Sequence, residues 1–129
     1  LLIDVKGRKL PLTRTTLETW VTEEDVDGLR RWQSTFGLGA VGLIAFVYQY
    51  PKEHASAPEA DRFEHGDRHY SCLAISVAQY QAHMRKRSDR WRTVYLPQRD
   101  FRRIARPLSN WLGVESRGAA PVASAAVGF

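Results

Sequence analysis

Two stretches near the start of the chain decide the fold: LLIDVKGRK at residues 1–9 and TEEDVDGLRRWQSTF at residues 22–36. The apolar residues of the first stretch predict a strand over residues 1–5, with Gly7 marking its end or a bulge. The second stretch predicts a helix, because Thr22 is a good N-cap, three acids follow it at the positive end of the helix dipole, and the third, Asp25, is the capping-box acid. Gly37 is a natural C-cap for this helix.

The next stretch, AVGLIAFVYQY at residues 40–50, is an apolar run bounded by Gly39 and Pro51. Its length and its β-branched and aromatic residues predict a strand covered on both faces. A strand, a helix and a second strand in this order predict parallel neighbours joined by a right-handed crossover.

The rest of the chain predicts further helices and strands around this unit. We expect Phe101, Ile104, Ala105 and Leu108 to form a buried stripe near its end. The expected segments are a polar loop over residues 52–67, a strand over 69–76, a helix over 77–86, a short strand over 93–96 and a helix over 97–106. This order predicts an α/β fold, a mixed sheet flanked by helices. Residues 1–112 are expected to form one domain, and residues 113–129, rich in small side chains, a disordered tail.

Composition excludes several classes of protein. The chain has 129 residues, 43% hydrophobic and 26% charged, which is typical of one globular domain and excludes a multidomain enzyme. The single cysteine, Cys72, excludes an intramolecular disulfide and fits a cytoplasmic location. The longest apolar run is too short to span a bilayer and no secretion signal opens the chain, so no membrane partner is expected.

Positive charge is concentrated in one stretch. The formal net charge is +5, yet residues 85–106 alone hold nine basic and two acidic residues, a balance of +7. Trp91 and Tyr95 lie within this stretch, and cations interleaved with aromatic rings are typical of a surface that binds a nucleic-acid backbone. The alternative is that these arginines form an ordinary solvated surface.

Asp4 and Lys6 are the candidate chemical groups. Two positions apart on a strand, their side chains point the same way, while Ile3 and Val5 point into the opposite layer. A carboxylate beside an ammonium can hold a divalent metal and orient a water for hydrolysis. The pair can equally be an ordinary surface ion pair. Gln33 falls on the apolar face of the following helix, where it either supports this site or is a satisfied polar group at the rim of the core.

These elements resemble the PD-(D/E)xK nuclease superfamily, in which a core strand carries an acid-x-Lys and the next helix often carries a Gln. The chain from Leu2 to about Leu108 also resembles the planctomycete HYExAFE family, through the segments DVKGRK, WVTEEDVDGLRRWQ and RPLSNWL. The resemblance implies a restriction-endonuclease-like fold and Mg²⁺-dependent hydrolysis of nucleic-acid phosphodiesters, with DNA the expected substrate. In that mechanism Asp4 ligates the metal, Lys6 orients the attacking water and Gln33 supports the site.

The expected nucleic-acid contacts come from the two basic regions of the chain. They are Arg8, Lys9, Arg85, Lys86, Arg87, Arg90 and Arg92.

The chain also departs from the family pattern. The His-Tyr-Glu element is missing, since His69 and Tyr70 are followed by Ser71. The superfamily's second metal-binding acid lies on the strand before the acid-x-Lys strand, which here would precede Leu1. We therefore expect an N-terminally truncated fragment that is inactive in isolation. A second acid upstream favours the enzyme, and its absence favours a non-catalytic module that binds nucleic acid or protein.

Overall fold

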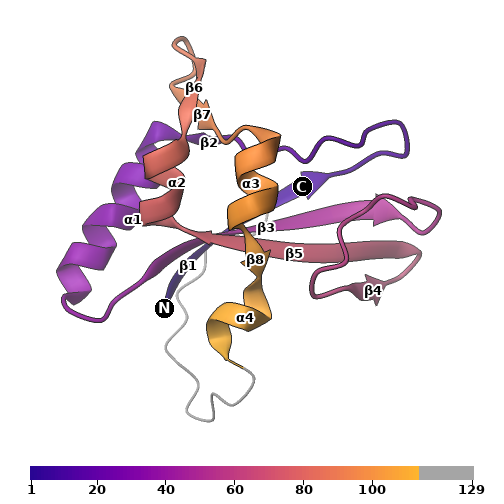
Figure 1. The fold of residues 1–129 in the computed structure, drawn as a ribbon, viewed down its shortest axis with the longest axis horizontal. Helices are drawn as coiled ribbons and strands as arrows, with labels where there is room; N and C mark the ends of the chain where they lie inside the picture. The colour runs from indigo at the N-terminus through magenta and orange to yellow at the C-terminus, as the bar shows by residue number, and fades with distance from the viewer. Residues whose placement is uncertain (114–129) are drawn as a thin grey trace.

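The apolar strand β3 (Gly42–Pro51) organises the sheet in the computed structural model, which describes residues 1–113. It pairs in parallel with β1 (Leu2–Lys9) and antiparallel with β5 (Arg68–Ser76). Two short strands complete this five-stranded sheet by pairing with β5: β4 (Phe63–His65) and β8 (Arg106–Pro107). Within residues 1–113, β1 is an edge strand that pairs with β3 alone. The described chain is therefore an α/β fold built on a mixed sheet (Figure 1).

The helix α1 (Glu23–Phe36) connects the two parallel strands, and its boundaries follow from local chemistry. The Thr22 hydroxyl accepts from the Asp25 amide at 3.0 Å, and the Asp25 carboxylate accepts from the Thr22 amide at 3.1 Å. This reciprocal capping box satisfies donors that the first turn would otherwise leave free. Gly37 ends the helix at a φ of 83°. The predicted helix and the parallel pairing are both confirmed.

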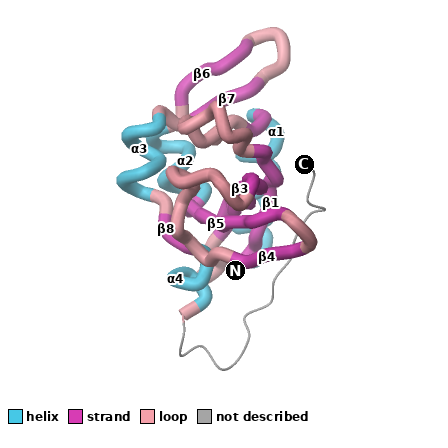
Figure 2. The backbone as a smooth tube through the Cα atoms, turned by 90° about the vertical axis from the view of Figure 1, so that its right-hand side faces the viewer, coloured by secondary structure: helices cyan, strands magenta, loops and turns pink. Residues whose placement is uncertain are grey.

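Three helices cover one face of the sheet and one covers the other (Figures 1 and 2). On the first face, α1 lies with α2 (Val77–His83) and α3 (Gln98–Ile104) over the larger apolar cluster. On the second face, α4 (Leu108–Leu112) packs Trp111 against a smaller cluster that includes Ile3 and Ala74. Both faces of β3 are therefore covered, as its apolar sequence predicts.

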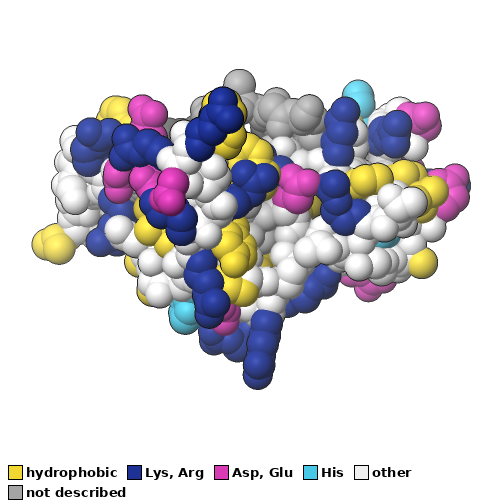
Figure 3. Space-filling view, turned by 90° about the horizontal axis from the view of Figure 1, so that it is seen from above, with side chains coloured by type: hydrophobic (Ala, Val, Ile, Leu, Met, Phe, Trp, Pro, Cys, Tyr) yellow, Lys and Arg dark blue, Asp and Glu magenta, His cyan; other side chains and the backbone are white. Residues whose placement is uncertain are grey.

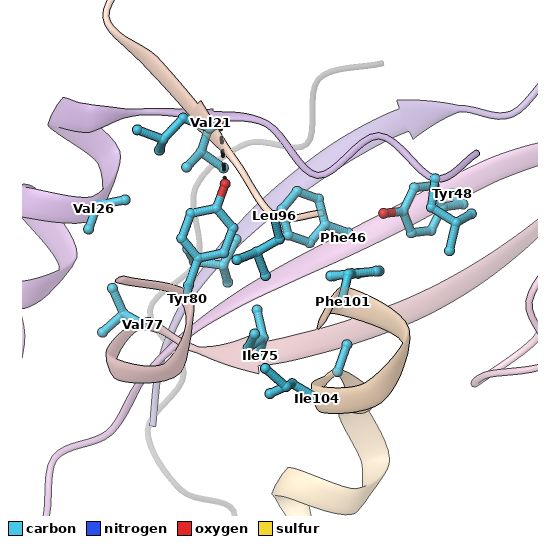
Figure 4. Close-up of a cluster of buried hydrophobic side chains, with 14 of the residues drawn as sticks. Val21, Val26, Phe46, Tyr48, Ile75, Val77, Tyr80, Leu96, Phe101 and Ile104 are labelled. Atoms are coloured by element: carbon cyan, nitrogen blue, oxygen red, sulfur yellow. Dashed lines mark hydrogen bonds between the residues drawn. The ribbon is translucent and has the colours of Figure 1, made fainter. Parts of the chain in front are cut away.

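Aromatic rings fill the centre of the larger cluster (Figure 4). Phe46 meets Phe101 edge to face, with ring centroids 5.5 Å apart. Tyr48 and Tyr80 are fully buried, and each donates its hydroxyl to a backbone carbonyl, of Glu18 at 2.8 Å and of Thr19 at 2.6 Å. Their burial therefore leaves no hydroxyl donor unpaired.

A small second sheet corrects one predicted boundary. Its strands are, in spatial order, β2 (Val21–Thr22), β7 (Thr93–Tyr95) and β6 (Arg85–Ser88). The predicted helix over residues 77–86 is wrong at its end, since α2 stops at His83 and Lys86 pairs with Val94 in a β-ladder. Pairing with distant strands outweighs the helix propensity of Arg and Lys here.

Three smaller predictions also need correction. The expected loop over residues 52–67 contains β4, which pairs with β5. The last expected helix ends at Ile104 instead of Arg106, and Leu108 begins a separate helix that packs on the opposite face from Phe101. Apart from Gly113, the predicted tail lies outside the described residues. In the described part of the chain, no helix has the length and apolarity needed to cross a bilayer.

Candidate functional site

Asp4 and Lys6 lie side by side on the face of β1 that α1 covers. Lys6 Nζ is 3.3 Å from Asp4 Oδ2, and both side chains are largely shielded from solvent, with exposed fractions of 21% and 16%. Ile3 and Val5 point the other way, into the smaller apolar cluster. The predicted alternation of side chains between the two faces of β1 is confirmed. Because β1 is an edge strand, Asp4 and Lys6 line an open groove.

A second carboxylate, from α1, meets the same ammonium. Lys6 Nζ is 3.1 Å from Asp25 Oδ2, so Lys6 bridges two acids from different elements. Asp25 also forms the capping box with Thr22, which fixes the carboxylate in place. The sequence revealed Asp25 only as a capping acid, because its proximity to Lys6 depends on how α1 crosses over β1.

The two carboxylates differ in electrostatic character. Desolvation raises the pKa of Asp4 above its ordinary value of 3.8 and outweighs the opposing charge of Lys6, while the neighbouring charge of Asp25 adds to the rise. Desolvation also pushes the pKa of Asp25 upward, but hydrogen bonds from Thr22 and the charge of Lys6 outweigh it and hold that pKa below 3.8. The fold therefore favours the ionised form of Asp25 and disfavours that of Asp4.

A groove of about 660 Å³ runs between β1 and α1 and is lined in part by Asp4, Lys6 and Asp25. Trp32 and Phe36 lie along its helical side, 59% and 61% exposed, with ring centroids 5.9 Å apart. The polar and charged side chains that line it are Asp4, Lys6, Glu24, Asp25 and Arg31. A ligand in this groove would meet carboxylates and an ammonium at one end and aromatic rings at the other.

Gln33 lies away from the carboxylates. Its side-chain oxygen accepts from the Gly42 amide at 2.8 Å, and Gln33 is absent from the residues that line the groove. Gly42 lies opposite Leu2 in the β1–β3 register, whereas Asp4 lies opposite Ile44. In the described chain Gln33 thus holds the start of β3, and it is not brought together with Asp4 and Lys6.

The side chains around Asp4 meet part of the requirements of a hard divalent cation. Within residues 1–113, no three His, Cys, Asp or Glu side chains converge closely enough to hold a metal ion by themselves. Mg²⁺, however, commonly uses one or two carboxylates and completes its shell with waters and substrate phosphates. Asp4 Oδ1 is buried without a hydrogen-bond partner, and a buried carboxylate oxygen in that state is suited to a cation. Asp4 therefore fits such an ion as one carboxylate ligand, while Asp25 Oδ2 is already engaged by the Thr22 amide and the Lys6 ammonium.

The basic residues at the end of β1 have separate environments. Arg8 donates to the Trp20 carbonyl at 2.6 Å and lies 4.3 Å from the centre of the Trp20 ring, so its guanidinium is engaged inside the protein. Burial lowers the pKa of Arg8. Lys9, the next residue, is exposed at the end of the strand. Of these two predicted nucleic-acid contacts, Lys9 alone presents its charge freely to solvent.

The predicted basic stretch divides into two parts in the structure. Five of its basic residues lie on the hairpin formed by β6 and β7: Arg85, Lys86, Arg87, Arg90 and Arg92. On and after α3, Arg102 donates to the Thr15 carbonyl and Arg103 pairs with Asp100 at 3.3 Å. Arg99 and Arg106 are exposed, and among residues 1–113 neither has a carboxylate partner, so both parts of the stretch carry free positive charge.

Cys72 is excluded as a nucleophile by its surroundings. It is buried among Ile3, Leu43 and Ala74, and desolvation, with the nearby charge of Asp61, raises the pKa of its thiol to about 12. A thiol with that pKa stays protonated and unreactive near neutral pH.

Comparison of the chain with protein-family models, with curated proteins and with solved structures finds no match.

Proposed function

We propose that this chain is part of a metal-dependent nuclease domain of the restriction-endonuclease-like type, hydrolysing phosphodiesters of nucleic acid, with DNA as its substrate. The single observation that carries the proposal is the buried, unpartnered Oδ1 of Asp4, beside Lys6 in an open groove. The β1–α1–β3 unit, with Asp4 and Lys6 on its first strand, agrees with the resemblance to the PD-(D/E)xK superfamily.

Each side chain has a defined task in this proposal. Asp4 would hold Mg²⁺, which when bound supplies charge neutralisation at the phosphate and acidifies a water. Lys6 has three N–H donors, two of which can be directed at Asp4 and Asp25, which leaves one to orient the attacking water. Asp25 is a positioning residue, because its fixed carboxylate holds the Lys6 ammonium over the groove.

The test is cleavage of duplex DNA in the presence of Mg²⁺, using the longest natural chain that contains these residues. We expect Asp4→Asn to abolish cleavage because the amide keeps the shape and loses the charge that holds the metal. Lys6→Ala should also abolish cleavage while metal binding survives. Asp27→Asn is the matched control, since it makes the same chemical change at an exposed position of α1 that does not line the groove. Full cleavage by Asp4→Asn, or equal loss in Asp27→Asn, would contradict the assignment.

The second candidate is a module on the same fold that binds nucleic acid or protein without catalysis. The observation that favours it is that, within residues 1–113, no three His, Cys, Asp or Glu side chains converge to hold a metal ion. If no Mg²⁺-dependent cleavage occurs in the wild type while nucleic-acid binding persists, this second candidate is the better one.

A further inference from the structure

The hairpin of β6 and β7 carries most of the net charge of the protein. Positions 85–92 hold five basic residues and one acid, a balance of +4, in a chain whose formal net charge is +5. The hairpin projects beyond the helices at one end of the molecule (Figures 1 and 2). Seen from that end, Lys and Arg side chains gather along the middle of the face (Figure 3). A charged projection of this kind is suited to an extended polyanion.

The basic side chains of the hairpin fall into two groups with different tasks. Lys86 Nζ lies 2.8 Å and Arg92 Nε 3.3 Å from the carboxylate of Glu23, on the first turn of α1. These two cations attach the hairpin to the helix. Among residues 1–113, Arg85, Arg87 and Arg90 have no carboxylate partner, and all three are exposed. The second group is therefore available to bind an anion.

The hairpin is held in one geometry before any ligand binds. Besides the two ion pairs, the Glu23 amide donates to the Arg92 carbonyl at 2.9 Å, and β7 pairs with β2. A bulge between Lys86 and Ser88 changes the direction of the chain at Arg87, whose guanidinium lies 5.0 Å from the centre of the Trp20 ring. Less conformational entropy is lost on binding when cations are held in this way.

Arginine side chains lie over both tryptophan rings near the hairpin, while Trp91 remains 67% exposed. Trp20 has the guanidinium groups of Arg8 and Arg87 over its ring, and Trp91 has that of Arg90 at 5.0 Å. Single-stranded nucleic acids bind by stacking bases on free aromatic faces. A duplex needs no such faces, because its bases are stacked on one another and its outer surface offers phosphates.

We propose that the β6–β7 hairpin docks in the major groove of B-form duplex DNA, with Arg85, Arg87 and Arg90 contacting the phosphates and groove edges. The major groove, about 12 Å wide, admits a two-stranded ribbon, whereas the corresponding groove of duplex RNA is too narrow for protein side chains. Lys86 and Arg92 hold the hairpin to Glu23 and do not contact the DNA.

This docking proposal rests on the proposed nuclease function and specifies its substrate as duplex DNA. Glu23, which anchors the hairpin, precedes Asp25 by two positions on α1, about 3 Å along the helix axis. The hairpin is therefore attached within one helical turn of Asp25, which contacts Lys6 and lines the groove, so a duplex held by the hairpin passes close to the groove.

The experiment measures binding of a labelled 20-base-pair DNA duplex by fluorescence anisotropy in EDTA, where no cleavage can occur, over a range of salt concentrations. For Arg87→Ala with Arg90→Ala, we expect about tenfold weaker binding and a salt slope shallower by about 1.8, from two phosphate contacts at roughly 0.9 each. Lys52→Ala with Arg68→Ala is the matched control, because it removes the same charge from exposed positions at the far end of the β3–β5 pair. That control should leave the slope unchanged.

Two further measurements keep the outcome clear. Circular dichroism checks that the variants fold, and Arg87→Lys with Arg90→Lys should retain the wild-type salt slope because it keeps both charges. Equal loss in the hairpin variant and the control, or tighter binding of single-stranded DNA or duplex RNA than of duplex DNA, would overturn the proposal. If the proposed nuclease activity is missing, the hairpin variants still decide this inference, since the assay contains no metal.

Discussion

Replacing Asp4 by Asn tests whether the Asp4 carboxylate stabilises the fold or is kept for a functional site. A stabilising carboxylate predicts a lower free energy of unfolding in the variant, and a functional one predicts an unchanged or higher value. The ion pair with Lys6 at 3.3 Å stabilises the fold by about 0–1 kcal/mol, as is usual for partly exposed pairs. Burial of the charge, which raises the pKa of Asp4 and leaves Oδ1 unpartnered, acts in the other direction. We predict that Asp4→Asn leaves the free energy of unfolding at pH 7 unchanged or higher.

Asp25→Asn is the comparison variant. Asn keeps an oxygen that can accept from the Thr22 amide, but it loses the negative charge at the helix N-terminus and the ion pair with Lys6 at 3.1 Å, so the substitution should cost about 1 kcal/mol. The two acids are neighbours around one ammonium, which makes the contrast between them informative.

The pH dependence separates the two acids further. For Asp4, whose folded pKa is raised, the stabilising contribution is fully present below 3.8 and is lost as the pH rises through the folded pKa. For Asp25, whose folded pKa is lowered, the contribution is present above 3.8 and is lost as the pH falls through the folded pKa. On acidification from pH 7 toward pH 3, the wild type should therefore gain stability relative to Asp4→Asn and lose it relative to Asp25→Asn.

The assay is urea unfolding followed by circular dichroism at a series of pH values. A loss of about 2 kcal/mol or more in Asp4→Asn at pH 7 would refute the reasoning, because it would mean that Asp4 is retained for stability. Equal pH profiles for the two variants would refute the assigned pKa directions.

One substitution and one chemical modification test the roles assigned to Gln33 and Cys72. Gln33→Ala should lower the free energy of unfolding, measured in urea, by about 1 kcal/mol because the Gly42 amide loses its acceptor. It should reduce DNA cleavage less than Asp4→Asn does. Loss of cleavage with unchanged stability would instead mean that Gln33 acts in the catalytic site. Native Cys72 should resist iodoacetamide at pH 8 and react once the protein is unfolded, since its thiol pKa is about 12; mass spectrometry of the native protein showing rapid alkylation would contradict this.

The parts of the fold that depend on local chemistry could be predicted from the sequence. The capping box of Thr22 and Asp25, the stop at Gly37 and the apolar run of β3 each act within a few residues. The parallel β1–β3 pair then follows from the short crossover. The facing of Asp4 and Lys6 was predictable in the same way, from the period of a strand.

The parts that depend on contacts between distant segments could not be predicted. Arg85 and Lys86 have good helix propensity, and their pairing with Tyr95 and Val94 becomes visible only in the fold. Asp25 meets Lys6 because a helix crosses a strand, and Gln33 bonds the start of β3 because the same helix ends there. From their positions on α1 alone, it was not possible to tell that Asp25 contacts Lys6 and that Gln33 does not.

The most direct test of the central claim, that Asp4 holds a divalent metal, is a Mn²⁺ titration followed by NMR of backbone amides in the longest natural chain that contains residues 1–113. The paramagnetic ion broadens nearby signals, so its position is read from the residues that lose intensity first. We predict that the amides of Ile3, Asp4, Val5 and Asp25 broaden first in the wild type and in Lys6→Ala, and that Asp4→Asn abolishes this pattern. Broadening that begins elsewhere, or that is the same in Asp4→Asn, would contradict the claim.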